Sequence, residues 1–216
     1  MADNRDRQAI LQRRLAWLEV PGLGLHLHLA HPRSRLAALT DAPPYWAYVW
    51  AGGLALALHL RATGLARGRR VLDLGAGSGV VGILAALEGA AEVTAVEPDP
   101  WGRAAIAINA AAHGVALSRA GGNPDLVLCG DVFYSAGVAA AVLPVLDGWR
   151  ARGVEVLVGD PGRADLPLQA LSLLARYPVA DVGEAARTRP AGVYAYRPDA
   201  RPGGDPGAIP GPDATP

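Results

Sequence analysis

The order of hydrophobic and polar positions divides most of the chain into short apolar runs and segments with helical spacing. The apolar runs, which predict buried strands, cover 70–74, 92–96, 125–130, 154–159, 177–183 and 192–197. The segments with helical spacing, which predict helices, cover 54–62, 80–88, 101–112, 136–149 and 165–176. Strands that alternate with helices are typical of a parallel sheet covered on both faces. The pattern therefore predicts a doubly wound, mostly parallel α/β fold.

The two ends of the chain carry different patterns. Residues 8–19 have helical spacing, whereas residues 21–29 alternate strictly, which predicts a strand or hairpin arm with leucines on its buried face. His26 and His28 fall on the opposite face, and because the segment holds no Cys, Asp or Glu, we expect exposed histidines and no metal site. Proline and glycine dominate the last residues, which predicts a disordered tail. The expected parts are an extension over 1–53, a main domain over 54–197 and a tail over 198–216.

The most informative stretch is VLDLGAGSG, in which a buried strand runs into a glycine-rich turn before a helix. Glycine has no Cβ, so such a turn lets a cofactor approach the backbone closely. The next strand ends in Glu97, which is placed to accept hydrogen bonds from ribose hydroxyls. A carboxylate at Asp73, inside the end of the first strand, would repel a pyrophosphate and suits a cationic, amino-acid-like group. These acids argue against a turn that binds nothing, and they favour S-adenosylmethionine over NAD as the cofactor.

A second pair of polar segments follows the later strands. The strand PDLVLCG runs into Asp131, Val132, Phe133 and Tyr134, and the strand VLVG runs into Asp160 and Arg163. In an open parallel sheet, ligands bind beyond the carboxyl ends of the central strands, so we expect Asp131 at the same edge as Asp73 and Glu97. The alternative role for Asp131 is to cap the following helix, for which Ser135 competes. For the Asp160 segment the alternative is a plain proline-glycine turn.

Composition narrows the classes of function. Basic and acidic residues number 20 each, so the net charge is zero, whereas nucleic-acid binders usually carry a basic stripe. No apolar run approaches the ~18 residues that a membrane span needs, and the charged N-terminus lacks the apolar core of a signal peptide. The single cysteine, Cys129, excludes an internal disulfide framework, and the lack of lysine excludes lysine-based catalysis. We expect a cytoplasmic protein that binds neither nucleic acid nor membrane.

Over residues 42–197 the chain resembles the seven-strand lysine methyltransferases of the electron transfer flavoprotein β-subunit. The segments that carry the resemblance are PPYWAYVWAGG, VLDLGAGSGVVGI, VEPDP, AINAAAHG, GDVFY and VGDPGR. It implies a seven-stranded, Rossmann-like methyltransferase sheet, S-adenosylmethionine as cofactor and a protein substrate. It implies catalysis by Asp131 and Tyr134, the D-x-x-Y element, which would face the reacting methyl group. The residues that it implies for cofactor binding are Trp50, Gly53, Asp73, Gly75, Gly77, Glu97 and Pro98.

One departure from related methyltransferases concerns the adenine. Such enzymes often place an acid after the third strand, but the segment 110–124 contains no Asp or Glu. We expect the adenine amino group to find a neutral acceptor there, with Ser118 and Asn123 as candidate side chains. Three other functions stay open: an NAD-dependent oxidoreductase, an N-methyltransferase acting on a ribosomal protein or a small molecule, and a non-catalytic cofactor-binding module.

Overall fold

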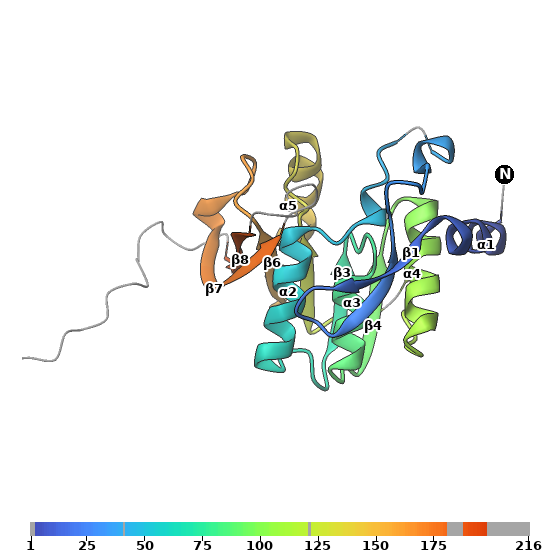
Figure 1. Ribbon diagram of the computed structural model, residues 1–216. Coiled ribbons are helices and arrows are strands. Elements are labelled where there is room, and N and C mark those ends of the chain that lie inside the picture. The colour runs from blue at the N-terminus through green and yellow to red at the C-terminus, as the bar shows by residue number, and fades with distance from the viewer. Residues whose placement is uncertain (1–2, 41, 121, 181–187, 198–216) are drawn as a thin grey trace, which may run out of the picture.

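A six-stranded mixed sheet forms the centre of the protein (Figure 1). The computed structural model describes residues 3–40, 42–120, 122–180 and 188–197. Strand order is β4-β3-β5-β6-β8-β7, in which β3 pairs in parallel with β4 and β5, and β5 pairs in parallel with β6. The strands are β3 (Arg70–Leu74), β4 (Glu92–Val96), β5 (Leu126–Gly130), β6 (Glu155–Asp160), β7 (Leu171–Ala180) and β8 (Thr188–Tyr196). The predicted α/β class with a mostly parallel sheet is confirmed.

The expected seventh strand is reduced to a single bridge within the described residues. Ser118 lies beyond β4 and pairs in parallel with Thr94. Its N–H donates to the carbonyl of Val93 at 2.8 Å, and its carbonyl accepts from the N–H of Ala95 at 2.8 Å. This segment is short and rich in glycine, so it lacks the apolar side chains that would extend the pairing. It nevertheless places Ser118 at the edge of the sheet next to β4.

Helices cover the two faces of the sheet, as expected. Figure 1 shows α2 (Ala51–Thr63) and α3 (Val80–Leu87) in front of the sheet and α5 (Ala136–Ala151) behind it. Helix α4 (Pro100–Ala112) lies on the face of α2 and α3, where Ile106 packs against Ala95 of β4. Helix α2 is almost wholly apolar because it lies between the sheet and the N-terminal hairpin. It ends at Gly64, whose φ of 66° is the left-handed conformation that glycine adopts most easily.

An N-terminal helix and hairpin add a further layer over this face. Helix α1 (Asn4–Arg14) packs against α4, and β1 (Ala16–Val20) pairs with β2 (Leu25–Leu29) in an antiparallel hairpin. The predicted helix over 8–19 is therefore wrong beyond Arg14, where the chain turns into β1. The predicted alternation is confirmed, since the leucines at 23, 25, 27 and 29 are all at most 8% exposed. They pack on the apolar side chains of α2 and α3.

The C-terminal part of the domain differs most from the sequence prediction. The helix predicted over 165–176 is wrong, because only a short 3-10 turn, η3 (Leu168–Ala170), precedes β7. Strands β7 and β8 form a long antiparallel hairpin that closes the sheet beyond β6. Pro178 lies in β7, the edge strand, where its missing N–H breaks no ladder on the open side. The predicted tail over 198–216 falls outside the described residues.

Three glycines allow α2 to dock directly on the ends of two strands. A Cβ on Gly52 would lie 2.1 Å from the carbonyl oxygen of Gly159, and one on Gly130 would lie 2.7 Å from Cα of Gly53. A Cβ on Gly159 would in turn lie 2.1 Å from the carbonyl oxygen of Gly52. Any side chain at these positions would push the helix off the sheet. The N-terminus of α2 is thereby fixed against the carboxyl ends of β5 and β6.

One further feature of the sheet is a buried thiol. Cys129 lies in β5 and is 0% exposed, packed between apolar side chains on the α5 side of the sheet. Within the described residues, no helix is long and apolar enough to cross a membrane.

Candidate active site

The glycine turn and Glu97 form one half of the site. Gly75, Gly77 and Gly79 all have positive φ, at 74°, 54° and 84°, so the chain can turn sharply between β3 and α3. Oε2 of Glu97 accepts from the N–H of Gly77 at 2.9 Å, and Oε1 accepts from the N–H of Asp99 at 2.9 Å. Burial raises the pKa of Glu97, although these two backbone donors oppose the shift. The acid predicted to meet the ribose is thus tied to the turn predicted to meet the methionine.

Two neighbours of Glu97 were not singled out from the sequence. A Cβ on Gly102 would lie 2.6 Å from Cγ of Glu97, so only glycine leaves room for this carboxylate. Arg103 donates to the carbonyls of Glu97 and Pro98 at 2.9 and 2.6 Å and so fixes the strand end that carries Pro98, which the resemblance assigns to cofactor binding. The sequence signal for both was their position in the first turn of the helix after the acid.

Asp73 lies beneath the glycine turn. Its side chain is 1% exposed, and Oδ2 accepts from the N–H of Gly82 in α3 at 2.9 Å. Burial raises the pKa of Asp73 to about 7, and the nearby charge of Glu97 adds to the rise. The structure therefore places this carboxylate as a support that joins β3 to α3. Its expected contact with the methionine part of the cofactor stays a prediction.

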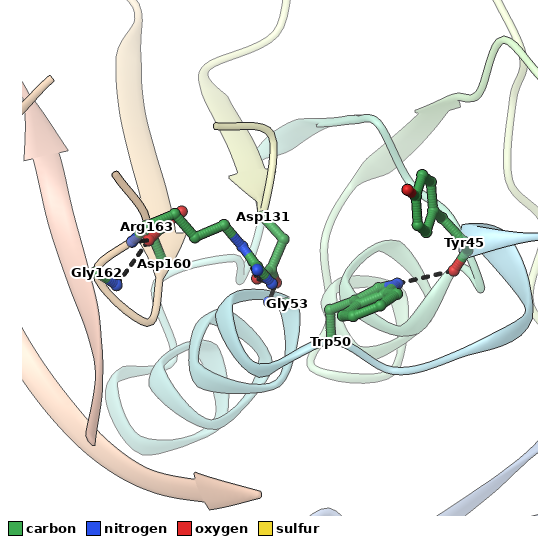
Figure 2. Close-up of polar contacts among 7 residues, drawn as sticks. All are labelled: Tyr45, Trp50, Gly53, Asp131, Asp160, Gly162 and Arg163. Carbon is green, nitrogen blue, oxygen red and sulfur yellow. Dashed lines mark hydrogen bonds and ion pairs between the residues drawn. The ribbon is translucent and has the colours of Figure 1, made fainter. Parts of the chain in front are cut away.

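Asp131 forms the centre of the other half, at the carboxyl end of β5. Oδ2 accepts from the N–H of Gly53 at 2.9 Å, and Oδ1 accepts from Nη2 and Nε of Arg163 at 2.8 and 3.3 Å (Figure 2). The side chain is 7% exposed, and burial raises its pKa to about 6 despite the arginine. Asp131 does not cap α5, because Ser135 does so by accepting from Val138. It caps the N-terminus of α2 instead, where the helix dipole favours a negative charge.

The backbone at Asp131 is unusual as well. Its φ is 55°, which is uncommon for a residue with a side chain, and within the described residues it shares this property only with Arg35 among the non-glycines. A residue held in this conformation costs about 1–3 kcal/mol and persists only where its surroundings fix it. Here the N–H of Asp131 donates to the carbonyl of Gly159 at 2.9 Å. The strained residue is the predicted catalytic acid, and both its backbone and its side chain are held in place.

Asp160, the last residue of β6, and Arg163, which follows the strand, complete this half. Asp160 is 0% exposed, and its Oδ1 accepts from the N–H groups of Gly162 and Arg163, both at 2.7 Å. The guanidinium of Arg163 lies over the ring of Trp50, 5.7 Å from its centroid. The sequence left open whether this segment was a turn or part of the site, and the structure brings Arg163 onto Asp131. The pairing was not visible in the sequence because 32 residues separate the two.

A group of aromatic side chains reaches Arg163, the partner of Asp131, through Trp50. Tyr134 is 49% exposed, and its ring lies 5.3 Å from the ring of Tyr45, which lies 5.8 Å from that of Trp50. Nε1 of Trp50 donates to the carbonyl of Tyr45 at 2.8 Å, which fixes the indole (Figure 2). The rings thus come from the aromatic segment before α2 and from the segment after β5. Among the predicted residues, Gly53 contacts Asp131 directly, and Trp50 contacts its partner Arg163.

The two halves meet at the glycine turn. A Cβ on Gly75 would lie 3.2 Å from the side chain of Val132, the residue after Asp131. The ends of β3, β4, β5 and β6 thus bring glycines, Glu97, Asp131 and Arg163 to one edge of the sheet, as an open α/β fold requires. Ser118 lies next to β4 near this edge, and its Oγ donates to the carbonyl of Ala120 at 3.0 Å. Within the described residues, no cluster of side chains is suited to a metal ion.

The residues of the first half fit S-adenosylmethionine. The backbone of the turn is open at Gly77, where a Cβ would meet no atom closer than 3.9 Å, so a cofactor could approach it. Glu97 offers carboxylate lone pairs to a diol next to that opening. Bound there, the cofactor would supply an activated methyl group on a sulfonium.

Comparison with known proteins supports the same class. The family model of ribosomal protein L11 methyltransferase matches residues 55–134. The electron transfer flavoprotein beta subunit lysine methyltransferase of Rattus norvegicus is 37% identical over 131 residues, which cover 56% of this chain and 51% of that protein. The enzyme of the same name from Xenopus laevis is 36% identical over 157 residues, which cover 64% and 62%.

The chain is similar to these lysine methyltransferases over 56–64% of its length. It spans about half the length of the rat relative, so the match concerns the shared domain. The expected resemblance is confirmed, and this similarity supports the methyltransferase class, with S-adenosylmethionine as the cofactor of that class.

Solved structures confirm the fold. The 16S rRNA N2 G1207 methyltransferase of T. thermophilus, in complex with AdoMet and guanosine, aligns with a TM-score of 0.54 at 22% identity over 85% of this chain and 50% of that one. A putative RNA methyltransferase from Pyrococcus horikoshii aligns with a TM-score of 0.50 at 16% identity over 91% and 98%. At these identities the likeness concerns the arrangement of strands and helices alone.

Proposed function

We propose that the protein is an S-adenosylmethionine-dependent methyltransferase that modifies lysine side chains of a protein substrate. The observation that carries the proposal is the position of Asp131, a buried carboxylate three residues before the exposed Tyr134 and at the same edge of the sheet as the glycine turn. The electron transfer flavoprotein β-subunit is the first substrate to test, because the relatives with about 37% identity are named for it.

In the proposed reaction, the main task of the protein is to align the substrate amine with the methyl group of the cofactor. Transfer of a methyl group from a sulfonium is an in-line displacement with a neutral leaving group, so the main task is to orient the nucleophile. A free lysine has a pKa near ~10.4 and must lose a proton before it can attack. Asp131 would accept a hydrogen bond from the amine and turn its lone pair toward the methyl group. The ring of Tyr134 would bind the cationic amine before deprotonation and the methylated product afterwards.

The exposed aromatic rings support a protein substrate. Tyr45 and Tyr134 are 47% and 49% exposed, so a side chain that projects from a folded partner could reach them without a lid closing over it. A small molecule would require a more enclosed pocket. Exposed aromatic rings together with a buried carboxylate therefore favour a long side chain with a cationic end.

The decisive experiment measures intact mass. The β-subunit is incubated with the protein and S-adenosylmethionine, and its mass is expected to rise in methyl-sized steps. Asp131→Asn serves as the inactive control, and the modified residue is then located by fragmentation. An unchanged β-subunit, together with clear labelling of a different protein or a metabolite, would contradict this substrate.

A ribosomal protein is the second candidate substrate. The match of residues 55–134 to the family of ribosomal protein L11 methyltransferases favours it. Incubation of the same enzyme with purified ribosomal proteins, under identical conditions, separates the two candidates.

A further inference from the structure

The strongest unassigned feature of the site is the ion pair between Arg163 and Asp131. Figure 2 shows the guanidinium reaching from the segment after β6 to the carboxylate at the end of β5. Nη2 and Nε of Arg163 both donate to Oδ1, at 2.8 and 3.3 Å, so the contact has two hydrogen bonds to a single oxygen. The arginine side chain is 24% exposed and the aspartate side chain 7%, so the carboxylate is buried and the guanidinium is partly exposed to solvent.

Arg163 is held on three sides. Its N–H is fixed by Oδ1 of Asp160, a residue with no exposed surface, so the backbone of the segment is anchored to β6. The indole of Trp50 lies under the guanidinium, and Trp50 itself is fixed through its hydrogen bond to Tyr45. A planar guanidinium between an aromatic face and a carboxylate is an arrangement that lysine does not reproduce. The geometry therefore fixes where the positive charge sits relative to Asp131.

The groups around Asp131 can be named by element. Arg163 faces it from the segment after β6, the N–H of Gly53 from α2, and the charge of Asp160 from the end of β6. Burial and Asp160 favour the protonated acid, whereas Arg163 and Gly53 favour the carboxylate. Within the described residues, removal of Arg163 would leave the N–H of Gly53 as the one hydrogen-bond donor that opposes the burial of the charge.

The balance between the protonated and the ionised form of Asp131 matters for the reaction proposed above, on which the inference rests. A bare carboxylate would stabilise an incoming ammonium and so hold back the proton that the amine must lose. A carboxylate already paired with arginine attracts the ammonium less, yet it can still accept a hydrogen bond. The three hydrogen bonds to Asp131 leave room for about one more, because an ionised carboxylate has about four lone-pair sites.

We propose that Arg163 is a positioning residue that keeps Asp131 ionised and oriented, so that the substrate amine meets an ion pair instead of a bare carboxylate. The group that receives the substrate amine is then the ion pair of Asp131 with Arg163, and not the carboxylate of Asp131 alone. Arg163 acts through Asp131 and lowers the tendency of the bound amine to keep its proton. The proton leaves to solvent before the amine attacks, and no group of the protein needs to store it.

A titration without substrate tests the first part of the proposal. The full chain is labelled with [13C]aspartate, the carboxyl resonance of Asp131 is assigned with Asp131→Asn, and its midpoint is followed by NMR. In Arg163→Gln the midpoint is expected to rise by about one pH unit or more, because a buried carboxylate loses its cation. Arg163→Lys should restore part of the shift, and Arg67→Gln, an exposed arginine far from the site, should leave it unchanged. An unchanged midpoint in Arg163→Gln would overturn the proposal.

A pH–rate profile tests the second part. With the protein substrate of the wild-type enzyme, the acidic limb of kcat/KM should move to higher pH in Arg163→Gln and recover partly in Arg163→Lys. A purely structural role would lower the rate by the same factor at every pH and leave the limb in place, which would also overturn the proposal. The two proposals fail separately: an inactive wild type contradicts the proposed function, whereas an active wild type with an unshifted variant contradicts only the role of Arg163.

Discussion

The N–H of Gly53 donates a hydrogen bond of 2.9 Å to Oδ2 of Asp131, across 78 residues of sequence. It joins the first turn of α2 to the end of β5, and the close glycine contacts of Gly52 with Gly159 make this approach possible. Trp50, the N-cap residue of α2, makes no side-chain capping hydrogen bond. The carboxylate of Asp131 therefore has a structural role toward α2 beside its proposed chemical role.

The first prediction tests this docking. Gly52→Ala should destabilise the protein by about 1–3 kcal/mol or more, because the new Cβ would lie 2.1 Å from a backbone oxygen that has no room to move. Urea unfolding followed by circular dichroism measures the change. The matched control is Gly148→Ala in α5, where a Cβ would meet no atom within 4 Å and helix propensity should add about 0.5–1 kcal/mol. Equal stability of the two variants would argue against the tight contact.

The second prediction concerns the cofactor. Glu97→Ala should weaken binding of S-adenosylhomocysteine by about 1–3 kcal/mol, through loss of the hydrogen bonds to the ribose. Calorimetry measures the affinity, and NAD should give no heat of binding. Glu88→Ala, which removes only the surface ion pair with Arg61, should bind as the wild type does. Binding of NAD without any response to S-adenosylhomocysteine would reverse the choice of cofactor.

The third prediction separates binding from catalysis. Asp131→Asn should keep most of the affinity for S-adenosylhomocysteine, because Glu97 and the glycine turn lie in the other half of the site. Methyl transfer should fall by about 10²-fold or more, since the amide attracts and orients the amine poorly. Turnover is measured with the protein substrate, and the melting temperature is recorded alongside. Near-normal turnover would show that Asp131 serves only to cap α2.

The fourth prediction is a pH dependence of stability. Asp73 has a pKa of about 7 in the folded protein, well above its ordinary value, because it is buried. The folded chain therefore binds the proton more tightly than the unfolded chain. The contribution to stability is complete at low pH and is lost as the pH rises through about 7.

Replacing this carboxyl with a neutral amide should remove that loss. Without cofactor, Asp73→Asn should be more stable than the wild type by on the order of 2–4 kcal/mol above pH 8 and about equal to it near pH 4. Denaturant unfolding at several pH values gives the difference. Asp165→Asn, an exposed aspartate, should show no such trend. A constant difference across the pH range would mean that the buried acid does not titrate in this window.

The sequence predicted those elements whose own pattern of apolar and polar residues is sufficient to determine their structure. The alternation of leucines from 23 to 29 fixed the buried face of β2, and the apolar run ending in Asp73 fixed β3 and the turn after it. It failed for β7, because LSLLARYPVA has leucines at both helical and strand spacing. Pairing with the neighbouring strand β8, which the spacing within β7 does not reveal, decides between them.

The candidate site divides in the same way. Glu97 beside the glycine turn followed from two adjacent strand ends, since each motif marks its own position. The contact between Arg163 and Asp131 depends on β5 and β6 being neighbours and on the strained φ at Asp131. Neither the order of these strands nor the φ of Asp131 can be predicted from the spacing of nearby residues in the sequence. The roles predicted for individual residues therefore await the variants above, although their gathering at one edge of the sheet is a feature of the fold.

The burial of Cys129 has a practical consequence. Burial raises the pKa of this thiol, so a thiol reagent should reach it only when the sheet opens. Because Cys129 is the one cysteine of the chain, the rate at which the reagent labels the protein measures how often the sheet opens. A ligand that binds the folded form should lower this labelling rate as its occupancy rises. The decrease therefore reports the affinity for the ligand without any methyl transfer.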